Sequence, residues 1–141
     1  MSDAMTAIDP AAVYGDLLGA PFRMGGRDPR TGLDCWGLRR EIARRLGVAS
    51  PEFAYPADDL ALSALHALVC GGKPSFIVLD APEPWCIVTF EIRPGYETHI
   101  GTVLPGLRRF VHCSRVLGRV VVSDLADARW RRKTRRYYRE R

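Results

Sequence analysis

The chain has 141 residues, of which 47% are hydrophobic and 26% are charged, and its net charge is +5. This composition excludes a disordered or fibrous chain and predicts one globular domain over residues 1–141. No apolar run approaches the roughly 20 residues that cross a bilayer, and the first residues lack the basic start and apolar core of a secretory signal. We therefore expect a protein made in the cytoplasm, without a membrane span.

The positive charge is concentrated at the C-terminus. Residues 129–141 contain eight Lys or Arg and one acid, whereas the rest of the chain has 13 bases and 15 acids. The cysteines form no C-x-x-C pair, which argues against a zinc knuckle or a disulfide framework. The four cysteines are Cys35, Cys70, Cys86 and Cys113.

The first half of the chain has helical patterns. Asp9 and Pro10 predict the start of a short helix that ends at Gly19, because Asp is a favoured N-cap and Pro fits the first helical position. A glycine- and arginine-rich loop follows over residues 20–33. A further helix is predicted over residues 59–70, before a pair of glycines.

The helix expected between these two begins at Asp34. Asp34 is the predicted N-cap, and Leu38, Ile42 and Leu46 recur at the spacing of one buried stripe. Gly47 ends the helix. We expect its arginines to face water: Arg39, Arg40, Arg44 and Arg45.

The second half of the chain changes to strand patterns, with β-branched and aromatic runs between Pro and Gly turns. An α+β domain is therefore predicted, with an antiparallel sheet of about five strands and the N-terminal helices packed on one face. A basic amphipathic helix over about residues 124–138 completes it. The expected strands cover residues 76–79, 86–92, 98–104, 109–113 and 119–123.

Cys35 lies in the first turn of the helix that Asp34 caps. The unpaired amides and the positive end of the helix dipole favour a thiolate there, as a nucleophilic cysteine requires. A base must lie within hydrogen-bonding reach. The sequence has three histidines: His66, within the apolar third helix, and His99 and His112, on neighbouring predicted strands.

The turn between those strands decides whether the two histidines meet. A two-residue loop at Pro105-Gly106 places His99 opposite His112, and a four-residue loop places His112 opposite Gly101. Both loops put the two rings on one sheet face, whereas a three-residue loop would separate them. Pro-Gly suits a tight hairpin poorly, which favours the longer loop or a bulge.

Three other interpretations remain open, two for the cysteine and histidines and one for the basic C-terminus. A cysteine at a helix start is often only a small buried hydrophobe. A zinc site from Cys35, Cys113 and the two histidines is disfavoured, because His112 and Cys113 are strand neighbours and face opposite sides. The basic C-terminus could bind nucleic acid, but an arginine-rich helix more often contacts an acidic partner or a polyanionic wall.

Three segments resemble the signature motifs of the NlpC-type cell-wall peptidases, and they occur in the family's order. Residues 18–38 (LGAPFRMGGRDPRTGLDCWGL) resemble G-x-P-[YF]-x-x-G-G followed by G-x-D-C-S-G-L. Residues 99–104 (HIGTVL) resemble H-[VI]-G-I-x-[LV], and residues 110–114 (FVHCS) resemble F-[IV]-H-A-S. The motifs span most of residues 14–123.

The resemblance implies a papain-like fold with Cys35 as nucleophile, His99 as base and His112 as the residue that orients the base. It implies a substrate in the peptide stems of peptidoglycan, the γ-D-glutamyl to diaminopimelate bond or a close relative, and neither a cofactor nor a metal. The compact domain is most similar to members carried on phage or gene-transfer-agent-like tails. Tail-tip and hub proteins are then the expected partners, and action in the periplasm or cell wall is expected.

Two residues depart from the family pattern near the expected substrate site. Trp36 replaces a small Ser beside the retained Asp34, which should narrow the pocket for the free amino end of the stem. Phe22 replaces a Tyr whose hydroxyl lies near the oxyanion, and the hydroxyl of Tyr14 is a possible substitute. Gly101 would leave room for a substrate backbone. The alternative function is a structural tail-tip protein that keeps this fold with little or no activity.

Overall fold

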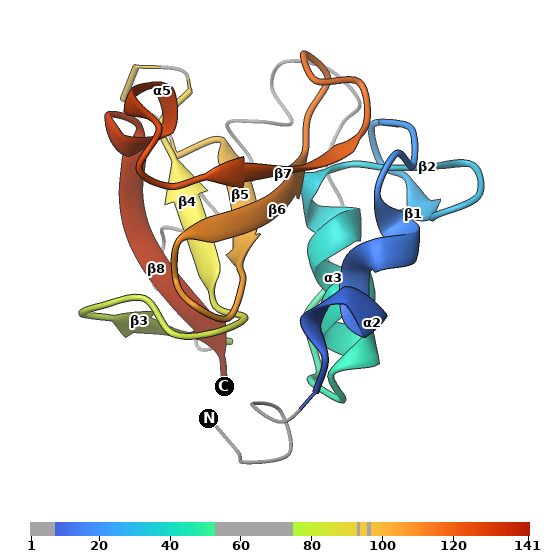
Figure 1. The fold of residues 1–141 in the computed structure, drawn as a ribbon, viewed down its shortest axis with the longest axis horizontal. Helices are drawn as coiled ribbons and strands as arrows, with labels where there is room; N and C mark the ends of the chain where they lie inside the picture. The colour runs from blue at the N-terminus through green and yellow to red at the C-terminus, as the bar shows by residue number, and fades with distance from the viewer. Residues whose placement is uncertain (1–7, 53–74, 93, 96) are drawn as a thin grey trace.

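The computed structural model describes residues 8–52, 75–92, 94–95 and 97–141. Its main features are a six-stranded sheet and, beside it, helices from the N-terminal part of the chain (Figure 1). The N-terminal elements are α2 (Pro10–Tyr14), the short 3₁₀ helix η1 (Gly15–Leu17), β1 (Arg27–Asp28), β2 (Gly32–Leu33) and α3 (Cys35–Arg45). The others are β3 (Phe76–Leu79), β4 (Ile87–Phe90), β5 (His99–Val103), β6 (Arg109–Cys113), β7 (Val120–Asp124), α5 (Ala128–Arg131) and β8 (Thr134–Glu140).

The capping residues explain where the first two helices begin. The Asp9 carboxylate accepts the Ala11 amide at 3.1 Å, with Pro10 at the first helical position, which confirms the start of α2. The Asp34 carboxylate accepts the Gly37 amide at 2.7 Å at the start of α3. Gly47 follows the end of α3 with a φ of +75°, a conformation that favours glycine. The helix expected over residues 59–70 lies outside the described residues.

The sheet is antiparallel throughout, in the order β3-β8-β4-β5-β6-β7. Its runs of β-branched and aromatic residues form all five expected strands, each within two residues of its expected ends. Helix α3 packs on one face, where Leu38 and Ile42 are buried with Val111 from β6. The α+β architecture is therefore confirmed.

The predicted basic helix over residues 124–138 is wrong. Only Ala128–Arg131 is helical, and Thr134–Glu140 forms the sixth strand, β8, between β3 and β4 (Figure 1). Tyr138 and Glu140 are buried while Arg139 between them is exposed, which is the two-residue period of a strand. Pairing on both edges of β8 outweighs the amphipathic pattern that suggested a helix.

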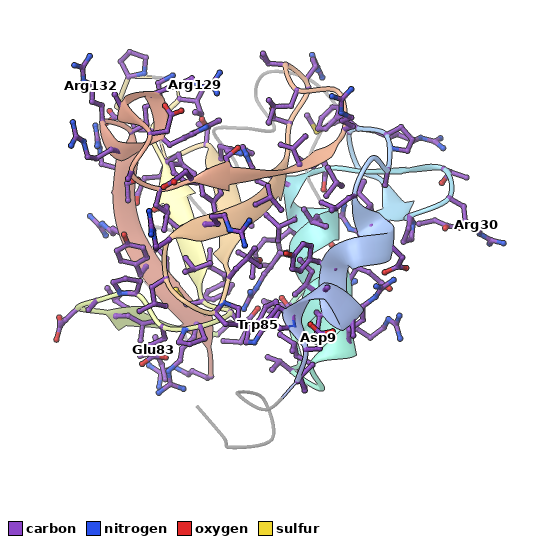
Figure 2. The ribbon with its side chains drawn as sticks, viewed as in Figure 1. Asp9, Arg30, Glu83, Trp85, Arg129 and Arg132 are labelled. Atoms are coloured by element: carbon purple, nitrogen blue, oxygen red, sulfur yellow. The ribbon has the colours of Figure 1, made fainter. Side chains whose placement is uncertain are left out.

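Arg39 does not face water as expected. Its side chain is buried, and its guanidinium forms a bidentate ion pair with Glu140 at 2.5 and 3.0 Å. Arg39 also donates to the carbonyl of Trp85, labelled in Figure 2, at 2.7 Å, and to the Thr102 hydroxyl at 3.2 Å. These bonds satisfy the buried charges and attach α3 to the sheet, one turn of helix beyond Cys35.

Candidate active site

The β5–β6 hairpin brings two of the predicted site residues together. Its registered pairs, Thr102 with Val111 and Val103 with Phe110, correspond to a four-residue loop over residues 105–108. The same register sets His112 opposite Gly101 and diagonal to His99. Nε2 of His99 lies 2.9 Å from Nδ1 of His112. The predicted placement of both rings on one face is confirmed, with the longer of the two loops.

Gly101 has a packing role in this hairpin. A Cβ built on Gly101 would lie only 2.6 Å from the Phe110 ring and 3.4 Å from Cβ of His112. The space that was expected to admit a substrate backbone is filled by Phe110. Gly101 therefore allows the Phe110 ring to lie across β5 beside His112, and its expected contact with substrate stays a prediction.

Cys35 is the first residue of α3, and its sulfur lies against the backbone of β5. Cys35 shares a buried cluster with Trp36 and with Ile100 of β5, and the Ile100 backbone is close enough to lower the pKa of the thiol. The registered β5–β6 pairs end at Thr102, two residues after Ile100. Cys35 therefore lies near the end of the β5–β6 ladder, beside the residue that follows His99.

Burial changes the expected chemistry of this thiol. The Cys35 side chain is only 8% exposed, and desolvation raises its pKa to about 12. The negative charge of Asp34 adds to the rise, and the hydrogen bonds from Ile100 and Trp36 oppose it. The thiolate that the helix dipole was expected to stabilise is thus absent at neutral pH, because desolvation outweighs the dipole. The resting Cys35 side chain is therefore a protonated thiol.

The two histidines are neutral at the same pH. Burial lowers the pKa of His99, and burial followed by the charges of His99 and Arg129 lowers the pKa of His112. Among the described residues, Nδ1 of His99 makes no hydrogen bond, since the bond to His112 uses Nε2. A neutral imidazole with one free nitrogen can accept a proton from a thiol.

Aromatic rings enclose the histidine pair. The Trp130 ring from α5 meets the His112 ring edge to face at 4.7 Å, and Phe110 lies 4.3 Å from it. Phe90 and Trp130 lie 5.7 and 6.0 Å from His99. The Arg129 guanidinium lies 5.3 Å from the Trp130 ring, and Figure 2 shows Arg129 at α5. These rings exclude water from the pair and cause the desolvation that keeps it neutral.

The side chains of Asp34 and Trp36 are buried and form hydrogen bonds within the protein. The Asp34 carboxylate, besides capping α3, accepts from the Gly25 amide at 2.8 Å and from Arg27 at 2.9 Å. Trp36 has no exposed surface, and its Nε1 donates to the Pro51 carbonyl at 3.0 Å. Both side chains are buried and stabilise the start of α3, so neither is placed to contact a substrate in this structure.

Tyr14 and Phe22 pack against a different cluster from Cys35. Both are half-buried beside the group that includes Leu33 and Leu38, whereas Cys35 belongs to a cluster with Trp36 and Ile100. The expected roles of Tyr14 and Phe22 near the oxyanion stay predictions.

Ser123 on β7 is a site residue that the sequence did not reveal. Its hydroxyl oxygen lies 2.8 Å from Nε2 of His112. Ser123 is paired with Phe110, two residues before His112, so the two side chains lie diagonally on neighbouring strands. Ser123 could have been found from the register of the β6–β7 hairpin, for which no prediction was made.

The ligands of the alternative zinc site do not gather. Cys113 donates to the Leu33 carbonyl at 3.4 Å on the α3 side of the sheet, whereas His112 faces Trp130 on the other side. In the described ranges, no three His, Cys, Asp or Glu side chains form a metal-binding group. Among those same residues, no helix has the length and apolar character of a membrane span.

Comparison with known proteins relates this fold to solved NlpC/P60 domains. No family model and no curated protein matches the chain, but solved structures do. A protein described as similar to lipoprotein, of the NLP/P60 family, from Staphylococcus aureus superimposes with a TM-score of 0.64 at 19% identity, over 99% of this chain and 42% of that one. This chain thus spans less than half of that protein.

Two mycobacterial structures are covered more fully. The P60 domain of an antigen from Mycobacterium avium subspecies paratuberculosis has a TM-score of 0.57 at 20% identity, over 91% of this chain and 88% of that one. The peptidoglycan hydrolase RipB from Mycobacterium tuberculosis has a TM-score of 0.54 at 18% identity, over 98% and 70%. The protein therefore has the NlpC/P60 fold.

Proposed function

We propose that the chain is a cysteine endopeptidase that cleaves peptidoglycan stem peptides. The observation that carries the proposal is the hydrogen-bonded His99–His112 pair, together with Cys35 at the start of α3, packed with Ile100, the residue that follows His99. The fold shared with a peptidoglycan hydrolase supports the class of substrate. The bond we propose is the one between γ-D-glutamate and diaminopimelate.

The protonation states lead to a general-base mechanism. Nδ1 of His99 takes the thiol proton as the Cys35 sulfur attacks the γ-carbonyl carbon, and His112 accepts the hydrogen bond from Nε2–H of His99. Among the described residues, the Cys35 backbone amide has no acceptor, so it can donate to the developing oxyanion. His99 then protonates the leaving amine, and water hydrolyses the thioester that remains.

Digestion of a defined wall peptide tests the proposal. We expect wild-type protein to cut a stem peptide containing L-Ala-γ-D-Glu-diaminopimelate, giving L-Ala-D-Glu and a fragment with a free diaminopimelate amine. Mass spectrometry identifies both fragments, and amine labelling counts the bonds cut. Intact peptide after prolonged incubation with folded protein would contradict the proposal.

A structural role is the second candidate, and one observation favours it. Cys35 is almost fully buried and its pKa is raised, which are the properties of an unreactive core thiol. In that case the wild-type protein would leave the stem peptide intact. The same digestion experiment therefore distinguishes the two functions.

The partner we propose is a tail-tip or hub protein of a phage or gene-transfer-agent-like particle. Exposed arginines on α5 support an acidic partner surface, because no acidic side chain pairs with them within the described part of the chain. They are Arg129, Arg131 and Arg132, of which Figure 2 labels Arg129 and Arg132.

A further inference from the structure

Three side chains form a hydrogen-bonded line that ends at β7. Nε2 of His99 lies 2.9 Å from Nδ1 of His112, and Nε2 of His112 lies 2.8 Å from Oγ of Ser123. The Cys35 sulfur lies against the residue after His99. Three of the four histidine ring nitrogens therefore have a hydrogen-bond partner in this line, and Nδ1 of His99 is the fourth.

While both histidines are neutral, two arrangements of their protons satisfy these contacts. Both rings can carry the proton on Nε2, or both can carry it on Nδ1, because a serine hydroxyl either accepts or donates. Only the first arrangement leaves Nδ1 of His99 as a free acceptor. The second places an N–H on the nitrogen that must act as the base.

Once His99 has taken the thiol proton, a single arrangement remains. An imidazolium carries protons on both nitrogens, so Nε2–H of His99 donates and Nδ1 of His112 must accept. The proton of His112 is then on Nε2, and it can only donate to Oγ of Ser123. In the charged state that catalysis passes through, the serine has to be an acceptor.

We infer that Ser123 is a positioning residue that holds His112 as the Nε2–H tautomer and thereby keeps Nδ1 of His99 ready to take a proton. The inference rests on the proposed function and extends its relay by one residue. Ser123 touches neither the thiol nor the substrate, and its effect passes through His112.

The surroundings of His112 leave few other acceptors for its Nε2–H. The His112 side chain has no exposed surface, and the rings of Phe110 and Trp130 cover it. A buried N–H without an acceptor is costly, and more so beside an imidazolium that it helps to stabilise. The nearby charge of Arg129 also lowers the pKa of His112, which keeps the transferred proton on His99.

Steady-state kinetics of Ser123→Ala on the stem peptide is the first test. We expect kcat to fall about 10- to 100-fold with KM unchanged, the effect of losing a hydrogen bond that supports a charge formed during the reaction. Ser123→Thr keeps a hydroxyl at this position and should recover most of kcat. In a His112→Ala background, Ser123→Ala should cause no further loss. A kcat of Ser123→Ala equal to that of the wild type would overturn the inference.

The nitrogen NMR signals of the histidines provide a second test that needs no activity. In wild-type protein at neutral pH, both rings should show a protonated Nε2 and an unprotonated Nδ1. Ser123→Ala should give His112 a mixture of tautomers, and Ser123→Thr should restore the single form. Unchanged tautomers in Ser123→Ala would contradict the positioning role even if the wild type proved inactive on wall peptides, so the two proposals fail separately.

Discussion

Cys35→Ala is expected to lose at least about 1,000-fold of the stem-peptide hydrolysis, because the variant lacks the sulfur that forms the thioester while the His99–His112 pair remains. The alanine is small and keeps the start of α3, so the fold should persist. Initial rates of amine release by equal amounts of folded wild-type and variant protein measure the loss.

Cys86→Ala is the matched control for this prediction. Cys86 is a second buried thiol, but it packs with Val88 and Phe90 and not with the residues around Cys35. Its replacement should reduce stability slightly and leave the rate within a few-fold of the wild type. Equal rates for the wild type and Cys35→Ala would show that Cys35 is not the nucleophile.

Glu140→Ala is expected to lower the free energy of unfolding by about 3–5 kcal/mol, the usual cost of leaving one member of a buried ion pair uncompensated. Arg39 would then keep its charge inside the protein without the carboxylate that it contacts at 2.5 and 3.0 Å. Urea unfolding followed by tryptophan fluorescence measures the change. Because the pair attaches α3 to β8, hydrolysis should also decline at temperatures where the variant begins to unfold.

The double variant Arg39→Met/Glu140→Leu separates the charge from the packing. It removes both ions and keeps apolar volume, so we expect it to recover most of the lost stability. A double variant no more stable than Glu140→Ala would show that packing, and not an unpaired charge, causes the loss.

The same ion pair sets an acid limit to stability. Burial raises the pKa of Glu140, but the charge of Arg39 and its hydrogen bonds outweigh burial, so the folded pKa lies below the ordinary 4.5. A carboxyl with a lowered folded pKa contributes its full stability above its unfolded pKa and loses it as the pH falls through the folded value. This contribution is therefore present at neutral pH and is lost as the pH falls below the ordinary pKa of 4.5 and through the lower folded pKa.

Local signals in the sequence were sufficient for most elements of the fold. Asp9 and Asp34 mark helix starts because an N-cap acts on amides two or three residues away. Runs of β-branched and aromatic residues between Pro and Gly turns locate the strands. The placement of His99 and His112 on one sheet face could be predicted by counting residues across the turn between β5 and β6. A two-residue loop and a four-residue loop both leave the two side chains on the same face.

The incorrect predictions depend on partners that are distant in sequence. Arg39 is buried because Glu140, 101 residues away, neutralises it. The segment that forms β8 has the composition of an amphipathic helix, and only its pairing with β3 and β4 decides the outcome. The thiolate expected at Cys35 is a further example, because desolvation of the thiol depends on the packing of α3 against β5 and not on the local sequence around the helix start.

Mapping the covalent intermediate tests the relay most directly. Acid quenching of the wild-type protein during turnover of the stem peptide should preserve a thioester to the L-Ala-γ-D-Glu acyl group, and Cys35 lies in a tryptic peptide, residues 31–39, that contains no other cysteine. We predict that this peptide alone gains the acyl mass. Rapid turnover with no acylated peptide, or with the acyl group on Cys70, Cys86 or Cys113, would contradict the role of Cys35 as nucleophile.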